Sequence, residues 1–247
     1  MLYTITPVFL GSAIVDKGDN LANTPRGIKM QTVYSCFVLR NDDGEVTLVD
    51  TGLMSQTAIQ EQDLPFRKME DAPDLIDALK GVGVDPAQIR RCILTHLHYD
   101  HCCNLRLLPA LEAIYVQQKE ILYALSPQES DYYLYMLRSD CGRCEWLDGI
   151  GKFVIVDGDR QIDSGLSVIL TSGHSRGGQC VVVETKEGKY ILTGDTIALY
   201  ESYEKAIPNS ICFDETIWYA SLNKIKALNA KILPSHDVAI FQRKVYG

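Results

Sequence analysis

The stretch Thr95-His96-Leu97-His98-Tyr99-Asp100-His101 places three imidazoles and one carboxylate within six consecutive residues. The apolar run Cys92-Ile93-Leu94 precedes it, and a second apolar run begins at Leu105. This pattern predicts a buried strand that ends in a loop and then a short helix. Histidine and aspartate together suit a borderline divalent metal. Because the chain has only five histidines, their crowding here indicates a metal site and not a loop with chance histidines.

The composition is that of a globular protein. The 247 residues are 46% hydrophobic and 23% charged, which is ordinary for a chain with a sizeable core. The net charge of −8 argues against a general nucleic-acid binder, which usually carries a basic excess. There is no signal-peptide pattern, and no apolar run approaches the roughly 18 residues of a membrane span. We therefore expect a cytoplasmic protein with no nucleic-acid or membrane partner.

Hydrophobic periodicity predicts the elements of the fold. We expect a single domain over residues 1–247, with an inserted helical segment near 126–150. Helices are predicted at 74–80, 118–125 and 215–228, the last from the spacing of Ile217, Trp218, Leu222, Ile225 and Leu228. Strands are predicted at 2–15, 32–40, 46–49, 114–116, 153–156, 167–171, 180–184, 190–193 and 232–233.

Two stretches far apart in the chain repeat one pattern. The strand that begins at Cys36 is followed by a turn with Gly44, a second strand and Asp50-Thr51. The strand that begins at Cys180 is followed by a turn with Gly188, a second strand and Asp195-Thr196. Two such hairpins predict a pseudo-symmetric sandwich of two sheets, with helices on the outer faces.

The remaining histidines also follow predicted strands. His174 comes after the strand at 167–171, and His236 comes after the strand at 232–233. Asp195 follows the strand at 190–193 through Gly194. All five histidines and two aspartates thus lie in strand-end loops, and seven such ligands divide into two metal sites. Two metals need a bridging group, which a carboxylate with two oxygens supplies, and both would then polarise one shared water.

The pattern His96-x-His98-x-Asp100-His101, followed in order by His174, Asp195 and His236, resembles the metallo-β-lactamase superfamily. The resemblance covers nearly the whole chain and implies an α/β (α+β) protein with an αββα four-layer sandwich. It implies that His96, His98 and His174 hold one metal. Asp100, His101 and His236 would hold the other, and Asp195 would bridge the two. Asp50 matches an acidic residue of that family that supports the ligands.

Within the family, the chain most resembles the N-acyl-homoserine lactone lactonases. The length and the run Gly194-Asp195-Thr196 carry this resemblance. In that branch a tyrosine three residues after the bridging aspartate helps to hold the carbonyl oxygen, and here that position is Ala198. We expect Tyr200 to supply the hydroxyl instead, with Tyr203 as the next candidate. The family's Gly-His-x-Pro-Gly-His run is also altered, to Gly173-His174-Ser175-Arg176-Gly177-Gly178.

The resemblance implies a dinuclear metal-dependent hydrolase that opens a lactone or related ester by attack of a metal-bridging hydroxide. Asp100 would pass a proton to the leaving oxygen. The cofactors would be two divalent ions, zinc first, with iron, manganese or cobalt as alternatives. The partner would be a small ester or lactone, and a homodimer stays open. Glyoxalase-II-type thioester hydrolysis is the main alternative. The acidic net charge argues against phosphodiester hydrolysis. His98 argues against a flavodiiron redox protein. The complete set of ligands argues against a binding module without activity.

Four further features have simpler readings. Cys141-x-x-Cys144 is expected to be a pair of incidental thiols, because no second pair completes a four-cysteine zinc site. Cys102 and Cys103 are expected to pack under the ligand loop. The tyrosines at 132–135 could wall a substrate pocket or pack the inserted segment, and both readings stay open. Arg176, beside His174, could meet an anionic group of the substrate or be solvated, and we expect it to be solvated.

Overall fold

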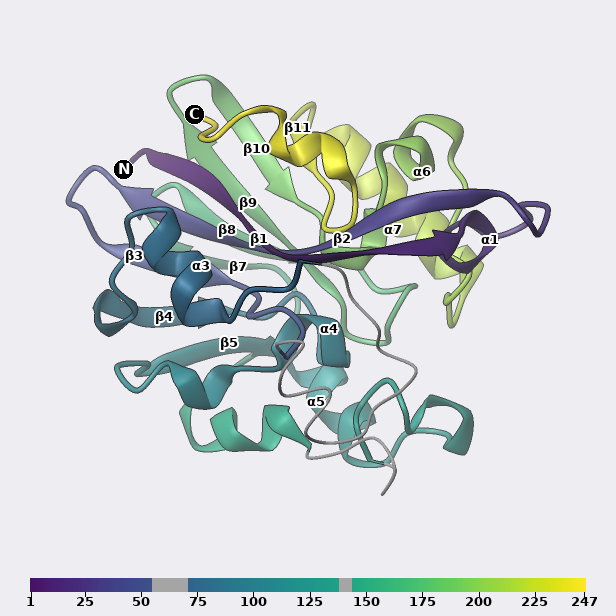
Figure 1. Cartoon of the computed structure of the whole chain (residues 1–247), viewed down its shortest axis with the longest axis horizontal. Helices are drawn as coiled ribbons and strands as arrows, with labels where there is room; N and C mark the ends of the chain where they lie inside the picture. Colours follow the sequence, from purple (N-terminus) through teal and green to yellow (C-terminus); the bar gives the residue numbers. More distant parts are fainter. Residues whose placement is uncertain (55–70, 138–143) are drawn as a thin grey trace.

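The computed structural model describes residues 1–54, 71–137 and 144–247 of the chain. Two β-sheets lie face to face at its centre, with helices on both outer sides (Figure 1). The first sheet contains, in spatial order, β1 (Tyr3–Asp16), β2 (Lys29–Asn41), β3 (Val46–Val49), β4 (Ile89–Ile93), β5 (Ala113–Gln117) and β6 (Phe153–Val156). The second contains β11 (Lys231–Leu233), β10 (Gly188–Leu192), β9 (Gln179–Thr185), β8 (Leu166–Leu170) and β7 (Arg160–Asp163).

The helices are short apart from α7. The α-helices are α1 (Lys17–Asn20), α3 (Leu75–Gly81), α4 (Tyr99–Cys102), α5 (Gln118–Leu125), α6 (Tyr200–Lys205) and α7 (Glu215–Ala227). The 3-10 helices are η1 (Pro86–Gln88), η2 (Leu105–Leu107), η3 (Glu129–Asp131), η5 (Glu145–Lys152), η6 (Gly194–Ile197) and η7 (Val238–Gln242). The inserted segment predicted near 126–150 therefore contains 3-10 helices and turns in its described residues, where Leu134, Tyr135, Met136 and Trp146 are buried. Residues 138–143 lie outside the described part.

Three hydrophobic clusters separate four layers. Alternate residues of a strand point to opposite faces of its sheet, and β9 shows this directly. Val181 and Val183 belong to the cluster between the two sheets, whereas Cys180 and Val182 belong to the cluster under α7. In β2, Phe37 likewise faces the other sheet, and its neighbours face a third cluster that includes side chains of α3 and α5. The predicted αββα sandwich is confirmed.

Both predicted hairpins are present, one in each sheet. β2 pairs antiparallel with β3, and β9 pairs antiparallel with β10. The predicted helix at 215–228 is also present as α7, whose N-cap Asp214 accepts a hydrogen bond from the backbone N–H of Ile217 at 3.0 Å. Trp218, Leu222 and Ile225 are buried, but Ile217 is not part of this face, because its side chain is 39% exposed.

Strand direction brings the candidate ligand loops together. β8 is antiparallel to β9, β9 is antiparallel to β10, and β10 is parallel to β11. The carboxyl ends of β8, β10 and β11 therefore meet at one edge of the second sheet. In the first sheet β3 and β4 are parallel and also end together. The two edges are joined where Gln179 donates from its backbone N–H to Thr95 O at 2.9 Å.

Candidate metal centre

Seven side chains converge at this edge in two adjoining groups of candidate metal ligands. Within each group the ligand atoms lie within 4.8 Å of one another. The residues come from the loops after β4, β8, β10 and β11 and from α4. One group is His96, His98 and His174, and the other is Asp100, His101, Asp195 and His236. The structure thus brings all seven sequence-predicted candidates together, with Asp195 grouped with Asp100, His101 and His236.

The first group consists of buried imidazoles. The Nε2 atom of His174 lies 3.1 Å from the Nδ1 atom of His98, and Nδ1 of His174 lies 2.7 Å from the carbonyl oxygen of Ile211. That carbonyl fixes the ring so that Nε2 points inward. Burial is the largest cause that lowers the pKa of His96 and His98 well below its usual value. These rings are therefore neutral, and their lone pairs are available to a cation.

The second group mixes imidazoles with carboxylates. Nε2 of His236 lies 3.0 Å from Oδ1 of Asp195 and 3.5 Å from Oδ2 of Asp100. The other nitrogen of His236, Nδ1, lies 2.7 Å from the carbonyl oxygen of Val33, which orients the ring. Burial alone lowers the pKa of His236, but the carboxylates of Asp195 and Asp100 outweigh it and raise that pKa. The excess of carboxylate charge in this group favours a bound cation.

Asp195 faces both groups with different oxygens. Its Oδ1 lies 3.2 Å from Nε2 of His101 in the second group, and its Oδ2 lies 3.6 Å from Nε2 of His174 in the first. Ser235 Oγ donates to Oδ1 at 2.6 Å, and the side-chain amide of Asn209 donates to the Asp195 backbone carbonyl at 2.8 Å. Asp195 is therefore held so that one carboxylate oxygen faces each group.

Asp50 supports the second group from behind. It follows β3 with a left-handed backbone (φ 60°) and is buried. Its carboxylate accepts from the backbone N–H of Thr95 at 2.7 Å and from the Thr95 hydroxyl at 2.8 Å, and its Oδ2 lies 2.9 Å from Nδ1 of His101. The carboxylate makes His101 present Nε2 to the cluster. Burial by itself lowers the pKa of His101, but Asp195, Asp100 and Asp50 together raise it well above its usual value.

The residues present fit divalent metals. Among the described residues, Nε2 of His96 and Nε2 of His101 are buried without a hydrogen-bond partner. Buried polar atoms are normally satisfied, and a cation bound by each group would satisfy both nitrogens. Imidazole nitrogen with carboxylate oxygen is the donor set of zinc and related transition metals.

A buried glutamate that sequence reasoning missed ties the two halves of the first group together. Glu120 of α5 accepts from the Leu97 N–H at 3.0 Å and the Tyr135 hydroxyl at 3.1 Å through Oε1. Its Oε2 accepts from the Ser175 hydroxyl at 2.9 Å and the Gly177 N–H at 2.8 Å. Leu97 lies between two ligands, and Ser175 follows His174. Nothing in the sequence around Glu120 indicates this role, because Glu120 looks like any charged residue of a short helix.

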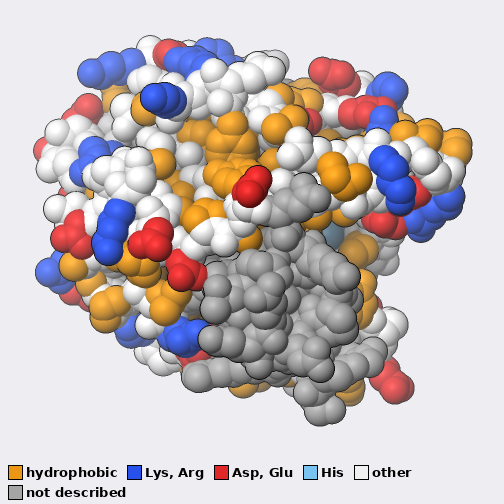
Figure 2. Space-filling view, viewed as in Figure 1, with side chains coloured by type: hydrophobic (Ala, Val, Ile, Leu, Met, Phe, Trp, Pro, Cys, Tyr) orange, Lys and Arg blue, Asp and Glu red, His pale blue; other side chains and the backbone are white. Residues whose placement is uncertain are grey.

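Two cavities open onto the cluster. A cavity of about 320 Å³ reaches His98 and His174 and is walled by Tyr133 and Tyr135, so the aromatic segment does line a pocket. Tyr135 also packs its ring against His98 with 5.0 Å between centroids. A second cavity of about 250 Å³ is lined by residues of both groups and by Val15, Asp19, Asn20, Thr32, Tyr34, Tyr99, Asn209 and Ile211. Figure 2 shows a histidine side chain at a recess of the surface, and since all five histidines belong to the cluster, this recess leads to it.

Tyr200 does not lie at the cluster, where we expected its hydroxyl. The Tyr200 hydroxyl donates to the carbonyl oxygen of Ile232 at 3.3 Å, and the side chain packs against two of the hydrophobic clusters. Tyr200 lines neither of the two cavities that open onto the metal ligands. Its backbone N–H is held by Asp237 Oδ2 at 3.0 Å, which directs the side chain inward. Tyr203 also lies against the core, beside Lys226. The phenols that do line the cavities are Tyr34, Tyr99, Tyr123, Tyr133 and Tyr135.

The structure agrees with the expectation for Cys102 and Cys103 but not with that for Arg176. Cys102 and Cys103 are buried under the ligand loop, as expected, with Cys102 Sγ 3.2 Å from the carbonyl oxygen of His98. Cys144 is a free, half-buried thiol, and Cys141 lies outside the described residues. Arg176 is not solvated as expected, because its guanidinium lies between the rings of Tyr123 and Phe213.

Comparisons with known proteins agree with this geometry. The chain is 29% identical over 234 residues to the N-acyl homoserine lactonase AiiA of Bacillus thuringiensis subsp. kurstaki, with 89% of this chain and 86% of the relative covered. It is 25% identical over 238 residues to the N-acyl homoserine lactonase AttM of Rhizobium johnstonii, with 88% and 86% covered.

Solved structures share the fold. An N-acyl homoserine lactone hydrolase with the product N-hexanoyl-L-homoserine at its catalytic metal centre superposes with a TM-score of 0.78 at 24% identity, covering 98% of this chain and 96% of the other. The dizinc quorum-quenching lactonase AidC gives a TM-score of 0.73 at 16% identity, covering 96% and 88%. The profile of the Metallo-beta-lactamase superfamily matches residues 31–236, a range that contains all seven candidate ligands. The chain therefore belongs to the metallo-beta-lactamase superfamily.

Proposed function

We propose that the protein is a dinuclear metal-dependent hydrolase that opens N-acyl-homoserine lactones or closely related lactones and esters. The observation that carries this proposal is the pair of adjoining ligand groups with Asp195 facing both. The lactonase relatives, which align over most of the chain, support the substrate class.

The metals would be held by His96, His98 and His174 on one side and by Asp100, His101 and His236 on the other, with Asp195 between them. Two such ions, when bound, would supply Lewis-acid polarisation of the substrate carbonyl and would lower the pKa of bound water toward neutrality. Zinc is our first choice, because the ligand set suits it and because AidC is a dizinc enzyme.

The chain's own residues prepare the site for an ester. Ser235 and Asn209 hold Asp195 in place, and Asp50 holds His101. Asp100 is the cluster carboxylate that is most open to the cavity, with 15% of its side chain exposed. We assign it the transfer of a proton to the leaving oxygen as the ring opens. Tyr99 and Tyr34 line the same cavity and would form its walls around the substrate.

The setting of the enzyme is part of the proposal. We propose a single domain over residues 1–247 that acts in the cytoplasm on a small ester or lactone. Buried cysteines such as Cys36, Cys92 and Cys180 carry free thiols, which supports a reducing compartment. No helix in the described ranges is long and apolar enough to cross a membrane. The homodimer stays a prediction.

The test is a comparison of kcat/KM on N-hexanoyl-homoserine lactone, a γ-lactone, an aryl ester, an acyl thioester and a bis-aryl phosphodiester at equal metal loading. We expect the lactones to be the best substrates. Asp100→Asn should lower kcat by about 10²-fold or more, as loss of a general acid does, whereas the exposed Asp43→Asn should not. A clear preference for the phosphodiester would overturn the proposal. A preference for the thioester would move the protein to the glyoxalase-II-like alternative.

A further inference from the structure

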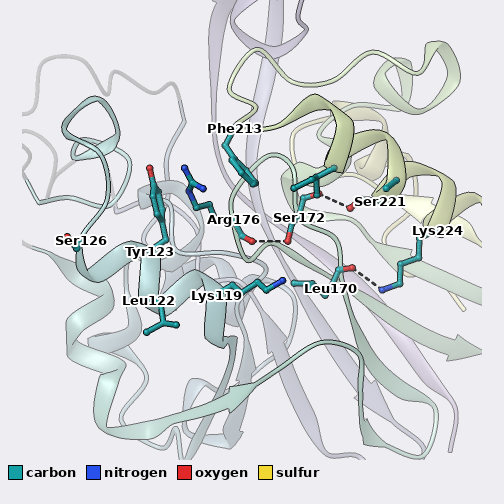
Figure 3. Close-up of a pocket in the computed structure, with 12 residues that line it drawn as sticks. Lys119, Leu122, Tyr123, Ser126, Leu170, Ser172, Arg176, Phe213, Ser221 and Lys224 are labelled. Carbon is teal, nitrogen blue, oxygen red and sulfur yellow. Dashed lines mark hydrogen bonds between the residues drawn. The ribbon is translucent and has the colours of Figure 1, made fainter.

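A third and larger cavity, of about 630 Å³, lies between α5 and α7 (Figure 3). None of the seven candidate metal ligands lines it. Its base is the loop after β8, which α7 holds in place. There Ser221 Oγ donates to the Ser172 carbonyl at 2.7 Å, and Lys224 Nζ donates to the Leu170 carbonyl at 3.0 Å. The proposed hydrolysis of a lactone gives this outer cavity no role.

Arg176 stands between the outer cavity and the cavity of about 320 Å³ that reaches His98 and His174, and it lines both, as Tyr123 and Phe213 do. Its guanidinium carbon lies 4.5 Å from the ring centroid of Tyr123 and 4.5 Å from that of Phe213, so the group is clamped between two aromatic faces. Its Nε atom is buried without a hydrogen-bond partner among the described residues. None of the carboxylates in the described ranges forms a salt bridge with it. A clamped guanidinium with unused donors is an unsatisfied site for a planar anion.

The rest of the lining adds positive charge and apolar surface. Lys119 and Lys224 also line the outer cavity, and none of its described lining residues is acidic. Lys224 is paired with Asp159, whereas the described residues offer Lys119 no salt-bridge partner. The apolar side chains of Leu122 and Ile217 are exposed there by 63% and 39%. In a chain with a net charge of −8, a cavity with three cations and an apolar wall selects an amphiphilic anion.

We propose that the outer cavity is a binding site for a small amphiphilic carboxylate. The carboxylate pairs with Arg176, whose planar fork matches it in two parallel hydrogen bonds. The alkyl chain lies along Leu122 and Ile217 and covers their exposed surface. Lys119 and Lys224 add to the positive potential that attracts the head group. Arg176 stands at the position where the lactonase-like run has a proline, so the site belongs to this chain's own sequence.

The test is calorimetric titration of the metal-loaded protein with decanoate. We expect one binding event that Arg176→Met weakens about tenfold or more, and Arg176→Lys by less, since Lys keeps the charge but not the fork. Ala220→Trp, a change on α7 that fills the outer cavity, should weaken binding to a similar extent. The exposed Lys152→Met is the matched control and should leave the affinity unchanged. Decanol should bind at least about tenfold more weakly than decanoate.

Two results would overturn the proposal. The first is an affinity for decanoate that neither Arg176→Met nor Ala220→Trp changes. The second is binding that disappears only when Asp195→Ala removes metal, because the carboxylate would then be a ligand at the metal centre. Metal content and circular dichroism of each variant separate loss of the outer cavity from loss of the fold. Ala220 lies on a different element from His174, so its variant tests the outer cavity even if Arg176→Met disturbs the nearby ligand loop.

Discussion

Glu120→Gln is the substitution that tests how the fold positions the first ligand group. The change keeps the size of the side chain but replaces one carboxylate oxygen with an NH₂ group. Each oxygen of Glu120 accepts from one backbone N–H, that of Leu97 or that of Gly177, and from one hydroxyl. A hydroxyl can turn to accept from the new NH₂, but a backbone N–H cannot. Whichever way the amide is oriented, one buried backbone donor loses its acceptor.

The size of the effect follows from that count. An unsatisfied buried donor costs about 1–3 kcal/mol, and the other bonds lose the extra strength of a charged acceptor, so we expect a loss of roughly 2–4 kcal/mol in the free energy of unfolding. Urea unfolding of the metal-loaded protein measures it. Glu112→Gln is the matched control, because this exposed carboxylate forms a surface salt bridge with Arg90 and its change should cost less than about 1 kcal/mol. A Glu120→Gln variant as stable as the control would refute the reasoning.

Three further substitutions test other parts of the account. Gly177→Ala should destabilise the protein by about 2 kcal/mol or more in urea unfolding, because the new methyl would meet the Glu120 backbone. The control Gly151→Ala has open space around the new methyl and should not destabilise the protein, and equal stability of the two variants would contradict this reasoning. Tyr200→Phe should leave kcat within about twofold while costing about 1 kcal/mol of stability, and a 10²-fold loss of kcat would restore the oxyanion role. Asp50→Asn should weaken metal affinity about 10–100-fold in an equilibrium competition with a chelator, because His101 loses the carboxylate that orients it. An unchanged affinity would contradict the role of Asp50 in orienting His101.

Much of the fold could be predicted because periodicity reports burial. The alternation in β9 and the apolar spacing in α7 mark faces that three clusters bury. β7 was not predicted, since Arg160–Asp163 is a polar edge strand with little to alternate. The convergence of the seven candidate side chains could be predicted, because parallel strands end at the same edge of a sheet and their end loops become neighbours in space.

Side-chain direction could not be predicted in the same way. Tyr200 follows Asp195 closely in sequence, but Asp237 holds its backbone N–H and turns the ring toward the core. Arg176 appeared to be a surface cation, and only the fold brings Tyr123 and Phe213 to its two faces. The role of Glu120 could not be predicted for the same reason, because the four groups that donate to it come from three separate segments of the chain.

The central claim is that these seven side chains hold two metal ions with Asp195 between them. Elemental mass spectrometry of the purified protein, after reconstitution with zinc and removal of loosely bound metal, measures this most directly. We predict two zinc ions per chain in the parent protein and a loss of metal in Asp195→Ala, with the exposed Asp43→Asn as the control that keeps both. A parent protein that binds no more than one ion per chain, or an Asp195→Ala variant that keeps two, would contradict the account.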